Sequence, residues 1–381
     1  MTASERVPQV SSRVSQSAFD GSRLRAVLLL DIRDGTQQQV LEAYEHMCNQ
    51  VASIPGHISD QLCQSIENPS QWLITSEWES APPFLNWVNS EEHLETVRPL
   101  RDCIRDTRSL RFSVLRETVS GRPAAADPAQ ARTQALPRMG DGVVRHALTF
   151  TVKPGSESKV AEILSGYTPP ETWVDDTTRL CRTSLFMYGN RVVQAIEVRG
   201  DLYDALRHVV RQPEMRAVEE ALRPHLQQER NLGDPQSTRM FFTRAALPVV
   251  HHVTSCRPEA PGARRHALYY PARNGRGTDL ARLLSQQAEL DADDPRSPVR
   301  ASTVFQRDDT VVRLVVLEGE PDDAPDAVLG LGKAESAAVA ARLLDGEALG
   351  VGESLAGERE VMRLLAHAGM QFITDRTAPD S

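Results

Sequence analysis

The segment RHALTFTVKPG, Arg145–Gly155, recurs as RHALYYPARNG, Arg265–Gly275, and a divergent copy, RAVLLLDIRDG, occupies Arg25–Gly35. The copies begin about 120 residues apart. In each copy, apolar side chains recur at alternate positions before a glycine, which is the pattern of a strand that ends in a turn. The spacing is too long for a solenoid repeat and has the length of a small domain. We therefore expect one structural unit that is used three times.

The segments after each motif predict the rest of that unit. In the first unit a helix follows, then two strands at about 58–66 and 71–78, a second helix from Ser90, and a closing strand, LRFSVL. The order β-α-β-β-α-β is the ferredoxin-like plan, an antiparallel sheet with helices on one face. The expected fold class is therefore α+β, with three tandem ferredoxin-like units. The apolar positions that predict the two helices are Val40, Tyr44, Met47 and Val51, and then Leu94, Val97, Leu100 and Ile104.

The composition along the chain predicts where the domains begin and end. The first 22 residues are polar and unpatterned, which is typical of a disordered tail. Stretches rich in Pro, Ala and Gly at about 119–142 and 253–263 are typical of linkers. We expect a tail at 1–22 and domains at 23–118, 143–252 and 264–376, of which the third is the most divergent.

A sheet with helices on one side leaves its other face open, and two such sheets can close face to face. Linkers of ~20 residues easily span a domain. We therefore expect two of the units to pair sheet to sheet within the chain. The remaining unit would keep an open face, so a homodimer is expected.

The composition argues against several classes of function. The net charge of −9 and the pI of about 5.6 argue against a nucleic-acid surface. No apolar run has the length of a signal or membrane segment, so a cytoplasmic location is expected. The five cysteines show no CxxC spacing, and His251, His252 and Cys256 have no clear fourth ligand for a metal. No nucleotide or flavin motif is present, so neither a cofactor nor a metal is expected.

Longer stretches of the chain resemble two protein families. The strand ENPSQWLITSEWES (67–80) and the helix NSEEHLETVRPL (89–100) resemble the antibiotic biosynthesis monooxygenase family, whose members are small dimeric α+β barrels. Three segments of the second unit resemble the SchA/CurD-like family, which is found beside genes for aromatic polyketide synthases. Together these resemblances imply a tailoring protein for a polycyclic aromatic polyketide. The segments of the second unit are RHALTFTVKPGSESKVAEILSGY (145–167), LFMYGNRVVQAIEVRGDL (185–202) and QPEMRAVEEALRPHL (212–226).

The first resemblance implies a reaction and a site. Some monooxygenases of that family oxidise phenolic rings with O₂ and no cofactor, and an Asn, a Trp four residues later and a Tyr six further on are implicated. The matching residues here are Asn68, Trp72 and Trp78, so a tryptophan replaces the phenolic donor. His93, at the start of the second helix, is the expected base because histidine titrates near neutrality. The expected substrate contacts are Trp78, Trp87, Phe84 and, in the second unit, Tyr188.

The same residues also fit purely structural roles, in which they take no part in a reaction. Two tryptophans on one strand face are also typical of core packing, a histidine in a first helical turn is often only exposed, and an asparagine before proline is typical of a turn. The predicted function is a cofactor-independent monooxygenase that hydroxylates a ring carbon or converts a phenol to a quinone. The alternatives are a polyketide cyclase or cyclisation aid on the same fold, and a non-catalytic partner in a complex with polyketide cyclases. Oxygen uptake separates the first function from both alternatives.

Overall fold

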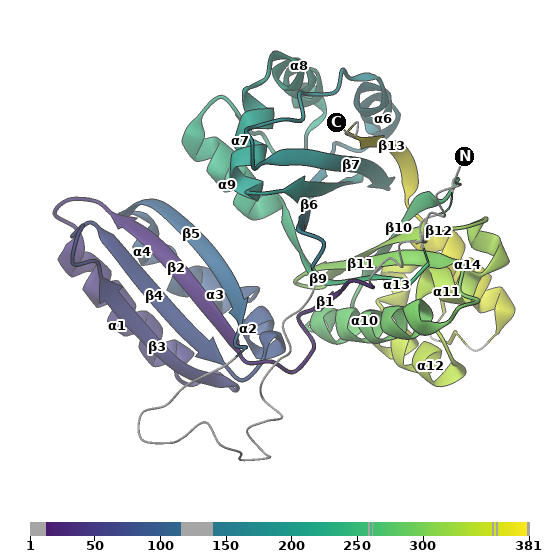
Figure 1. The fold of residues 1–381 in the computed structure, drawn as a ribbon, viewed down its shortest axis with the longest axis horizontal. Helices are drawn as coiled ribbons and strands as arrows, with labels where there is room; N and C mark the ends of the chain where they lie inside the picture. The colour runs from purple at the N-terminus through teal and green to yellow at the C-terminus, as the bar shows by residue number, and fades with distance from the viewer. Residues whose placement is uncertain are drawn as a thin grey trace, which may run out of the picture. The chain divides into compact units, whose positions relative to one another are not determined.

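The computed structural model describes residues 13–115, 140–257, 260, 262–352, 354–355 and 357–378 (Figure 1). It divides into two compact units. We call Ser17–Arg138 the N-terminal unit, and Met1–Gln16 together with Met139–Ser381 the barrel unit. No helix in the described part of the chain is long and apolar enough to cross a membrane.

The N-terminal unit is a four-stranded antiparallel sheet with helices against one face (Figure 1). Its strand order is β3-β4-β2-β5. The second predicted helix is broken into short pieces, and Ile104, which was expected on it, begins the last strand. The elements are β2 (Leu24–Ile32), α1 (Gln37–Val51), β3 (His57–Gln64), β4 (Gln71–Trp78), α2 (Ala81–Val88), α3 (Glu91–Thr96), α4 (Arg98–Arg101) and β5 (Ile104–Ser113).

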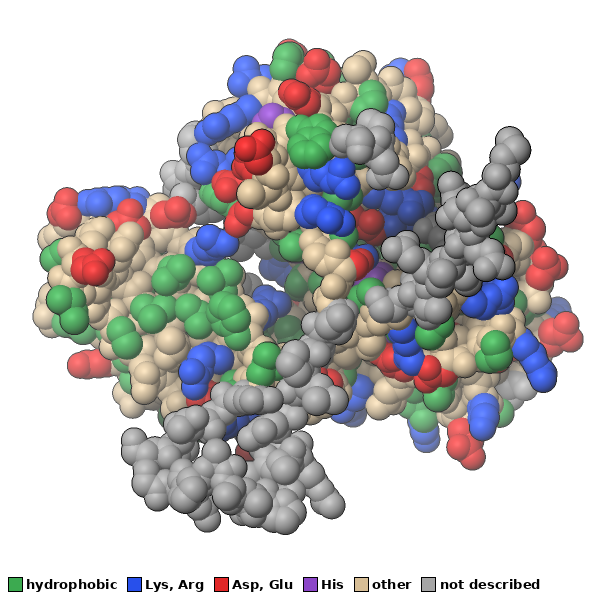
Figure 2. Space-filling model, viewed as in Figure 1, with side chains coloured by type: hydrophobic (Ala, Val, Ile, Leu, Met, Phe, Trp, Pro, Cys, Tyr) green, Lys and Arg blue, Asp and Glu red, His purple; other side chains and the backbone are tan. Residues whose placement is uncertain are grey.

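Alternation along β2 sorts its side chains between the two faces of this sheet. Leu24, Leu30 and Ile32 are buried on the helix side. Leu29 on β2 and Phe112 on β5 lie on the opposite face and are 41% and 49% exposed. Figure 2 shows hydrophobic side chains gathered over the strands of this unit. The N-terminal unit therefore presents an apolar sheet face that nothing within its described residues covers.

The barrel unit holds the other strands in one sheet of order β10-β12-β11-β9-β6-β8-β7-β13, with β1 added on β9 (Figure 1). Its first half contains β6 (Val143–Thr151), α6 (Glu157–Gly166), β7 (Arg179–Tyr188), β8 (Arg191–Arg199), α7 (Leu202–Arg211), α8 (Pro213–Leu222), α9 (Pro235–Ala245) and β9 (Ala246–Thr254). Its second half contains β10 (Arg264–Pro271), α10 (Gly277–Asp293), β11 (Val299–Arg307), β12 (Thr310–Leu317), α11 (Pro325–Leu329), α12 (Ala334–Leu343), α13 (Gly346–Leu349), α14 (Glu358–Ala368) and β13 (Gln371–Thr377). Single 3₁₀ turns occur at Arg223–His225 and Pro321–Asp323.

The last strand of each half pairs with a strand of the other half. Strand β9 ends the first half and pairs with β11 of the second, while β13 ends the second half and pairs with β7 of the first. A bridge between Leu268 and Gly369, with the Met370 N–H donating to the Ala267 carbonyl at 2.9 Å, nearly closes the sheet into a barrel. Inside, Phe186 and Val193 of one half pack with Phe305 and Val312 of the other.

The structure confirms an α+β fold built of antiparallel sheets, while the description as three repeats of one unit stays a prediction. The expected disordered tail is wrong for residues 13–22. Strand β1 (Ser15–Ser17) pairs with β9, and Val14 is buried with its N–H donating to Thr254 Oγ1 at 2.9 Å. Residues 1–12 and most of the linker predicted at 119–142 lie outside the described residues.

Candidate functional site

The core of the predicted site is a stack of aromatic rings between β4 and α2. The Trp78 side chain, at the end of β4, is fully buried. Its ring lies 5.6 Å from the centroid of Trp87 in a stacked arrangement and 5.6 Å from Phe84 edge-on. Phe84 and Trp87 meet Trp78 together because they are three residues apart on one helix face. Pro82 and Pro83 suit the first turn of this helix, which follows Ser80 directly.

His93 joins this stack at its half-buried edge. Ser90 caps α3, and its Oγ accepts a hydrogen bond from the His93 main-chain N–H at 3.1 Å. This cap fixes where the helix starts and turns the imidazole edge-on to Trp87, with ring centroids 4.2 Å apart. The structure therefore brings together four of the residues expected from the sequence: Trp78, Phe84, Trp87 and His93.

Asn68 and Trp72 are engaged elsewhere, in the turn between β3 and β4. The Asn68 side-chain oxygen accepts hydrogen bonds from the N–H and the hydroxyl of Ser70, at 3.2 and 2.8 Å. The indole N–H of Trp72 donates to the Pro69 carbonyl at 2.9 Å, and its side chain is buried. Both polar groups therefore stabilise the turn, while a catalytic role for Asn68 and Trp72 stays a prediction.

The turn role of Trp72 predicts the behaviour of Trp72→Phe, which keeps an aromatic ring and removes the N–H donor. We expect a loss of about 1 kcal/mol in the free energy of unfolding, the usual net value of one hydrogen bond, with turnover unchanged. Urea unfolding and steady-state rates check the two parts. A tenfold fall in turnover at unchanged stability would instead assign the N–H to the substrate.

A second histidine, His57, contacts the aromatic stack and was not predicted from the sequence. His57 Nε2 lies 2.8 Å from Asp60 Oδ2, with both side chains more than nine-tenths buried, and the imidazole is edge-on to Trp78 at 5.2 Å. Residues three apart on a regular strand point to opposite faces. Here the pairing register shifts between His57 and Ser59, and this bulge returns both side chains to the helix side. Burial and then Asp60 raise the pKa of the neighbouring Tyr44 to about 12.

The remaining predicted contact, Tyr188, lies in the barrel unit at the end of β7. Its ring stacks on Tyr269 with centroids 4.6 Å apart, and the Arg191 guanidinium lies 5.7 Å from the Tyr269 ring. Burial, and then Tyr269, raise the pKa of Tyr188 above its ordinary value. Tyr188 therefore closes one end of the barrel interior as part of an aromatic pair.

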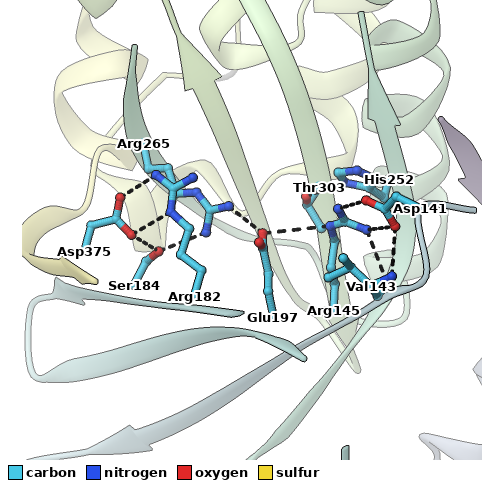
Figure 3. Close-up of polar contacts among 10 residues, drawn as sticks. All are labelled: Asp141, Val143, Arg145, Arg182, Ser184, Glu197, His252, Arg265, Thr303 and Asp375. Carbon is cyan, nitrogen blue, oxygen red and sulfur yellow. Dashed lines mark hydrogen bonds and ion pairs between the residues drawn. The ribbon is translucent and has the colours of Figure 1, made fainter. Parts of the chain in front are cut away.

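The opposite end of the interior holds a network of buried charges, in which the arginine of the recurring motif is central (Figure 3). Arg265 donates to Ser184 Oγ at 3.0 Å and to Glu197, and Arg145 pairs with Asp141. Figure 3 shows Glu197 between the two arginines. The other members are Arg182 and Asp375, joined by two hydrogen bonds of 3.0 and 2.6 Å, and the pair His252 and Thr303.

The adjacent histidines of β9 do not form a metal site. His252 Nδ1 is 2.9 Å from Thr303 Oγ1 inside the barrel, whereas His251 Nε2 is 3.7 Å from Glu289 of α10 on the other side of the strand. Burial, and then Arg145, lower the pKa of His252 to about 3, so this imidazole is uncharged. Among the described residues, no group of three His, Cys, Asp or Glu side chains is placed to hold a metal.

Asp375 predicts a dependence of stability on pH. Burial raises the pKa of this carboxyl, but the hydrogen bonds from Arg182 and Ser184 outweigh it and hold the pKa of Asp375 below its ordinary value. A group with a lowered native pKa stabilises the fold above its unfolded pKa of about 3.9, and this stabilisation is lost as the pH falls through the native value. We expect the barrel unit to lose stability below about pH 4, and Asp375→Asn to remove that part of the loss. Parallel pH profiles for the two proteins in urea unfolding would contradict this.

Comparison with known proteins confirms both resemblances. The family model described as antibiotic biosynthesis monooxygenase matches residues 23–99, and the one described as SchA/CurD like domain matches residues 143–255. The chain is 61% identical to Protein SchA of Streptomyces halstedii over 100% of both chains. It is also 61% identical to Polyketide synthase CurD of Streptomyces cyaneus, over 97% of this chain and 98% of that one.

Solved structures give a weaker likeness. SnoaB, a cofactor-independent oxygenase from Streptomyces nogalater, matches with a TM-score of 0.24 and 14% identity, over 26% of this chain and 98% of that one. A putative antibiotic biosynthesis monooxygenase from Nitrosomonas europaea matches with a TM-score of 0.24 and 13% identity, over 26% of this chain and 96% of that one.

Proposed function

Because this chain belongs to the family of SchA and CurD, we propose that it tailors an aromatic polyketide. The proposed reaction is a cofactor-independent monooxygenation in the N-terminal unit, which matches the antibiotic biosynthesis monooxygenase model. The substrate is a polycyclic phenol, and O₂ is the second substrate. The observation that carries the proposal is the stack of Trp78, Phe84 and Trp87 with His93 edge-on to it.

The half-buried rim of this stack supports the assignment of the base. Trp78 and Phe84 are buried, whereas Trp87 and His93 are only partly covered, so a flat ring that enters from solvent meets the last two first. An indole face stacks on an aromatic ring, and an imidazole beside it can accept a proton. His57 packs edge-on against Trp78 and pairs with Asp60, and both side chains are more than nine-tenths buried, so we assign them a role in positioning Trp78.

The proposed chemistry needs only a proton acceptor from the protein. His93 removes a proton from the activated ring carbon, and the electron pair of the resulting anion is transferred to O₂. A carbon–oxygen bond forms, the peroxide anion takes the proton back from His93, and the resulting hydroperoxide loses water to leave a carbonyl. Overall a CH₂ group and O₂ become C=O and H₂O, so the substrate supplies all the electrons.

Oxygen consumption tests this proposal. With an anthrone substrate, the purified full chain should consume one O₂ for each quinone formed, above the rate of spontaneous oxidation. A chelator should not change this rate, because no metal takes part in the proposed reaction. Uptake no faster than in buffer would overturn the oxygenase proposal and leave the two non-oxidative functions.

One observation favours a second function, a non-oxidative cyclase. The indole N–H of Trp78 donates to Ser76 Oγ at 2.7 Å, and that of Trp72 donates to Pro69. Neither donor is therefore available for an oxygen anion derived from O₂. An aldol-type ring closure by His93 uses no O₂, and the enolate and alkoxide oxygens that it forms belong to the substrate. Formation of ring-closed product under argon would support the cyclase, and absence of both reactions would support a non-catalytic partner of polyketide cyclases.

The open face of the N-terminal sheet predicts a homodimer. Within the barrel unit, the corresponding sheet face of one half packs against the sheet face of the other half. We expect a second copy of the chain to cover Leu29 and its neighbours in the same way. Sedimentation should give a dimer at micromolar concentration, and Leu29→Asp should give a monomer. Leu41→Asp is the matched control, because Leu41 is similarly exposed but lies on α1, and it should leave the dimer intact.

A further inference from the structure

We propose that the charged end of the barrel interior is a second ligand site, which binds the carbonyl oxygen of an uncharged, flat aromatic ketone. The site comprises Arg145, Arg265, Glu197 and His252, and lies in the barrel unit. The oxygen acceptor follows from the geometry alone, whereas the aromatic body of the ligand rests on the proposed function.

The arginines of this network differ in how many of their guanidinium N–H donors have an acceptor. In Arg182, Nε and Nη2 form one edge of the guanidinium that is fully paired with Asp375. In Arg265, the same edge is half used: Nη2 donates to Glu197, and Nε is buried with no hydrogen-bond partner among the described residues. The side chain of Arg265 is 6% exposed, so bulk water does not reach this N–H.

Arg145, on the other side of Glu197, also has a guanidinium N–H donor without an acceptor. Its two Nη atoms pair with Asp141, and its Nε lies 3.9 Å from Glu197 Oε1, beyond hydrogen-bond distance. This Nε is also buried, and no described residue accepts from it. Buried N–H groups that lack an acceptor are costly and rare. Both unused donors belong to guanidinium groups beside one glutamate, so an acceptor oxygen bound next to Glu197 has an unused N–H donor within the site.

The charges already present in the site determine whether the ligand oxygen is charged or neutral. Three guanidinium groups, of Arg145, Arg182 and Arg265, face three carboxylates, of Asp141, Glu197 and Asp375. His252 is uncharged, and its buried Nε2 has no partner among the described residues. An anionic ligand would therefore bring an uncompensated negative charge into a buried site, which is strongly unfavourable. A ketone or quinone oxygen accepts the same hydrogen bonds without adding charge.

The next layer of the barrel is made of small side chains. Ala147, Ala195 and Ala267 lie two positions further along the three strands that carry Arg145, Glu197 and Arg265, and so point to the same interior. These alanines are the smallest members of the core cluster that also holds Phe186 and Phe305, so the layer next to the charges is apolar and has little bulk, which suits a flat ring. Asp141 is 29% exposed, so this end of the interior reaches solvent.

Two ligands of matched shape test the site on the full chain. 2-Acetonaphthone carries the ketone, and 2-naphthoate replaces its methyl ketone by a carboxylate. In equilibrium titrations followed by calorimetry without turnover, we expect saturable binding of 2-acetonaphthone, and binding of 2-naphthoate weaker by at least ~10-fold. No saturable binding of the ketone, or equal affinities for the two, would overturn the proposal.

Arg265→Lys keeps the charge opposite Glu197 and removes the unused Nε donor. It should weaken binding of the ketone about tenfold, the equivalent of one hydrogen bond. Arg376→Lys is the matched control: Arg376 also donates to carbonyls, of Tyr167 and Ser165, but lies outside the network, so affinity should not change. If Arg265→Lys loses its native circular dichroism, Arg145→Lys takes its place with the same expectation. Unchanged affinity in the folded variant would disprove the site.

Different results contradict the monooxygenase proposal and the proposal of a ligand site in the barrel. Loss of oxygen uptake with ketone binding retained counts against the monooxygenase alone. Absence of an affinity change in Arg265→Lys, while oxygen uptake is observed, counts against the barrel site alone.

Discussion

His93→Ala is expected to lower the turnover of the proposed oxidation by ~10²–10⁴-fold, the usual contribution of a positioned general base. The imidazole is the titratable group that lies edge-on to Trp87 at the half-buried rim of the aromatic stack. Removing it leaves the stack in place, so affinity for the aromatic substrate should change much less than the rate. Single-turnover kinetics, with binding measured separately, distinguish the two effects.

His57→Ala is the matched control for this experiment. Its imidazole also contacts the aromatic stack, but its side chain is only 7% exposed and faces Asp60. The expected result is a loss of stability, because the Asp60 carboxylate is left buried, with turnover per folded molecule nearly retained. If His57→Ala abolishes turnover and His93→Ala does not, the base is His57 and our assignment of the two histidines is reversed.

Glu197→Ala is expected to destabilise the barrel unit by about 3–5 kcal/mol, the usual cost of removing one member of a buried ion pair. Glu197 is the paired carboxylate of Arg265 and lies beside Arg145, and the side chains of both arginines are less than one-tenth exposed. Without Glu197, the Arg265 charge remains inside the barrel with only Ser184 as its partner. Hydrogen exchange at the amides of β7 and β13 reports the stability of this unit directly.

Glu77→Ala in the N-terminal unit provides the comparison. Glu77 pairs with Arg23 and Arg25, which are 28% and 47% exposed and remain hydrated when the carboxylate is lost. The cost there should be about 1 kcal/mol, as for pairs near the surface. Equal losses in the two variants would mean that Glu197 does not hold a buried charge.

The sequence predicted those parts of the molecule that depend on local patterns. Alternation and helical spacing located most strands and helices, and the placement of Trp78 and His93 within one unit followed from them. His57 was missed because its role depends on a bulge, which alternation cannot indicate. Helix α2 was missed because its eight residues are shorter than the periodicity test requires, although Phe84 and Trp87 lie on it.

The pairing of β9 and β13 with strands of the other half could not be predicted from the sequence for a different reason. An edge strand can pair with any open edge, and its own residues do not specify which one. The same limit applies to Arg265, whose carboxylate partner lies in the other half of the barrel, 68 residues away in sequence. Interactions between distant segments become visible only when the topology is known.

The covalent link between the two halves of the barrel allows them to differ. Arg145 is opposite Glu197 on its neighbouring strand, whereas Arg265, in the equivalent place, is opposite Val316. In a barrel of two identical chains, every substitution occurs twice about the symmetry axis, so one glutamate shared by two arginines would be accompanied by a second. In a single chain each substitution occurs only once, so the second glutamate is not required. Its interior is therefore directional, and an unsymmetrical ligand inside it has one preferred orientation instead of two equivalent ones.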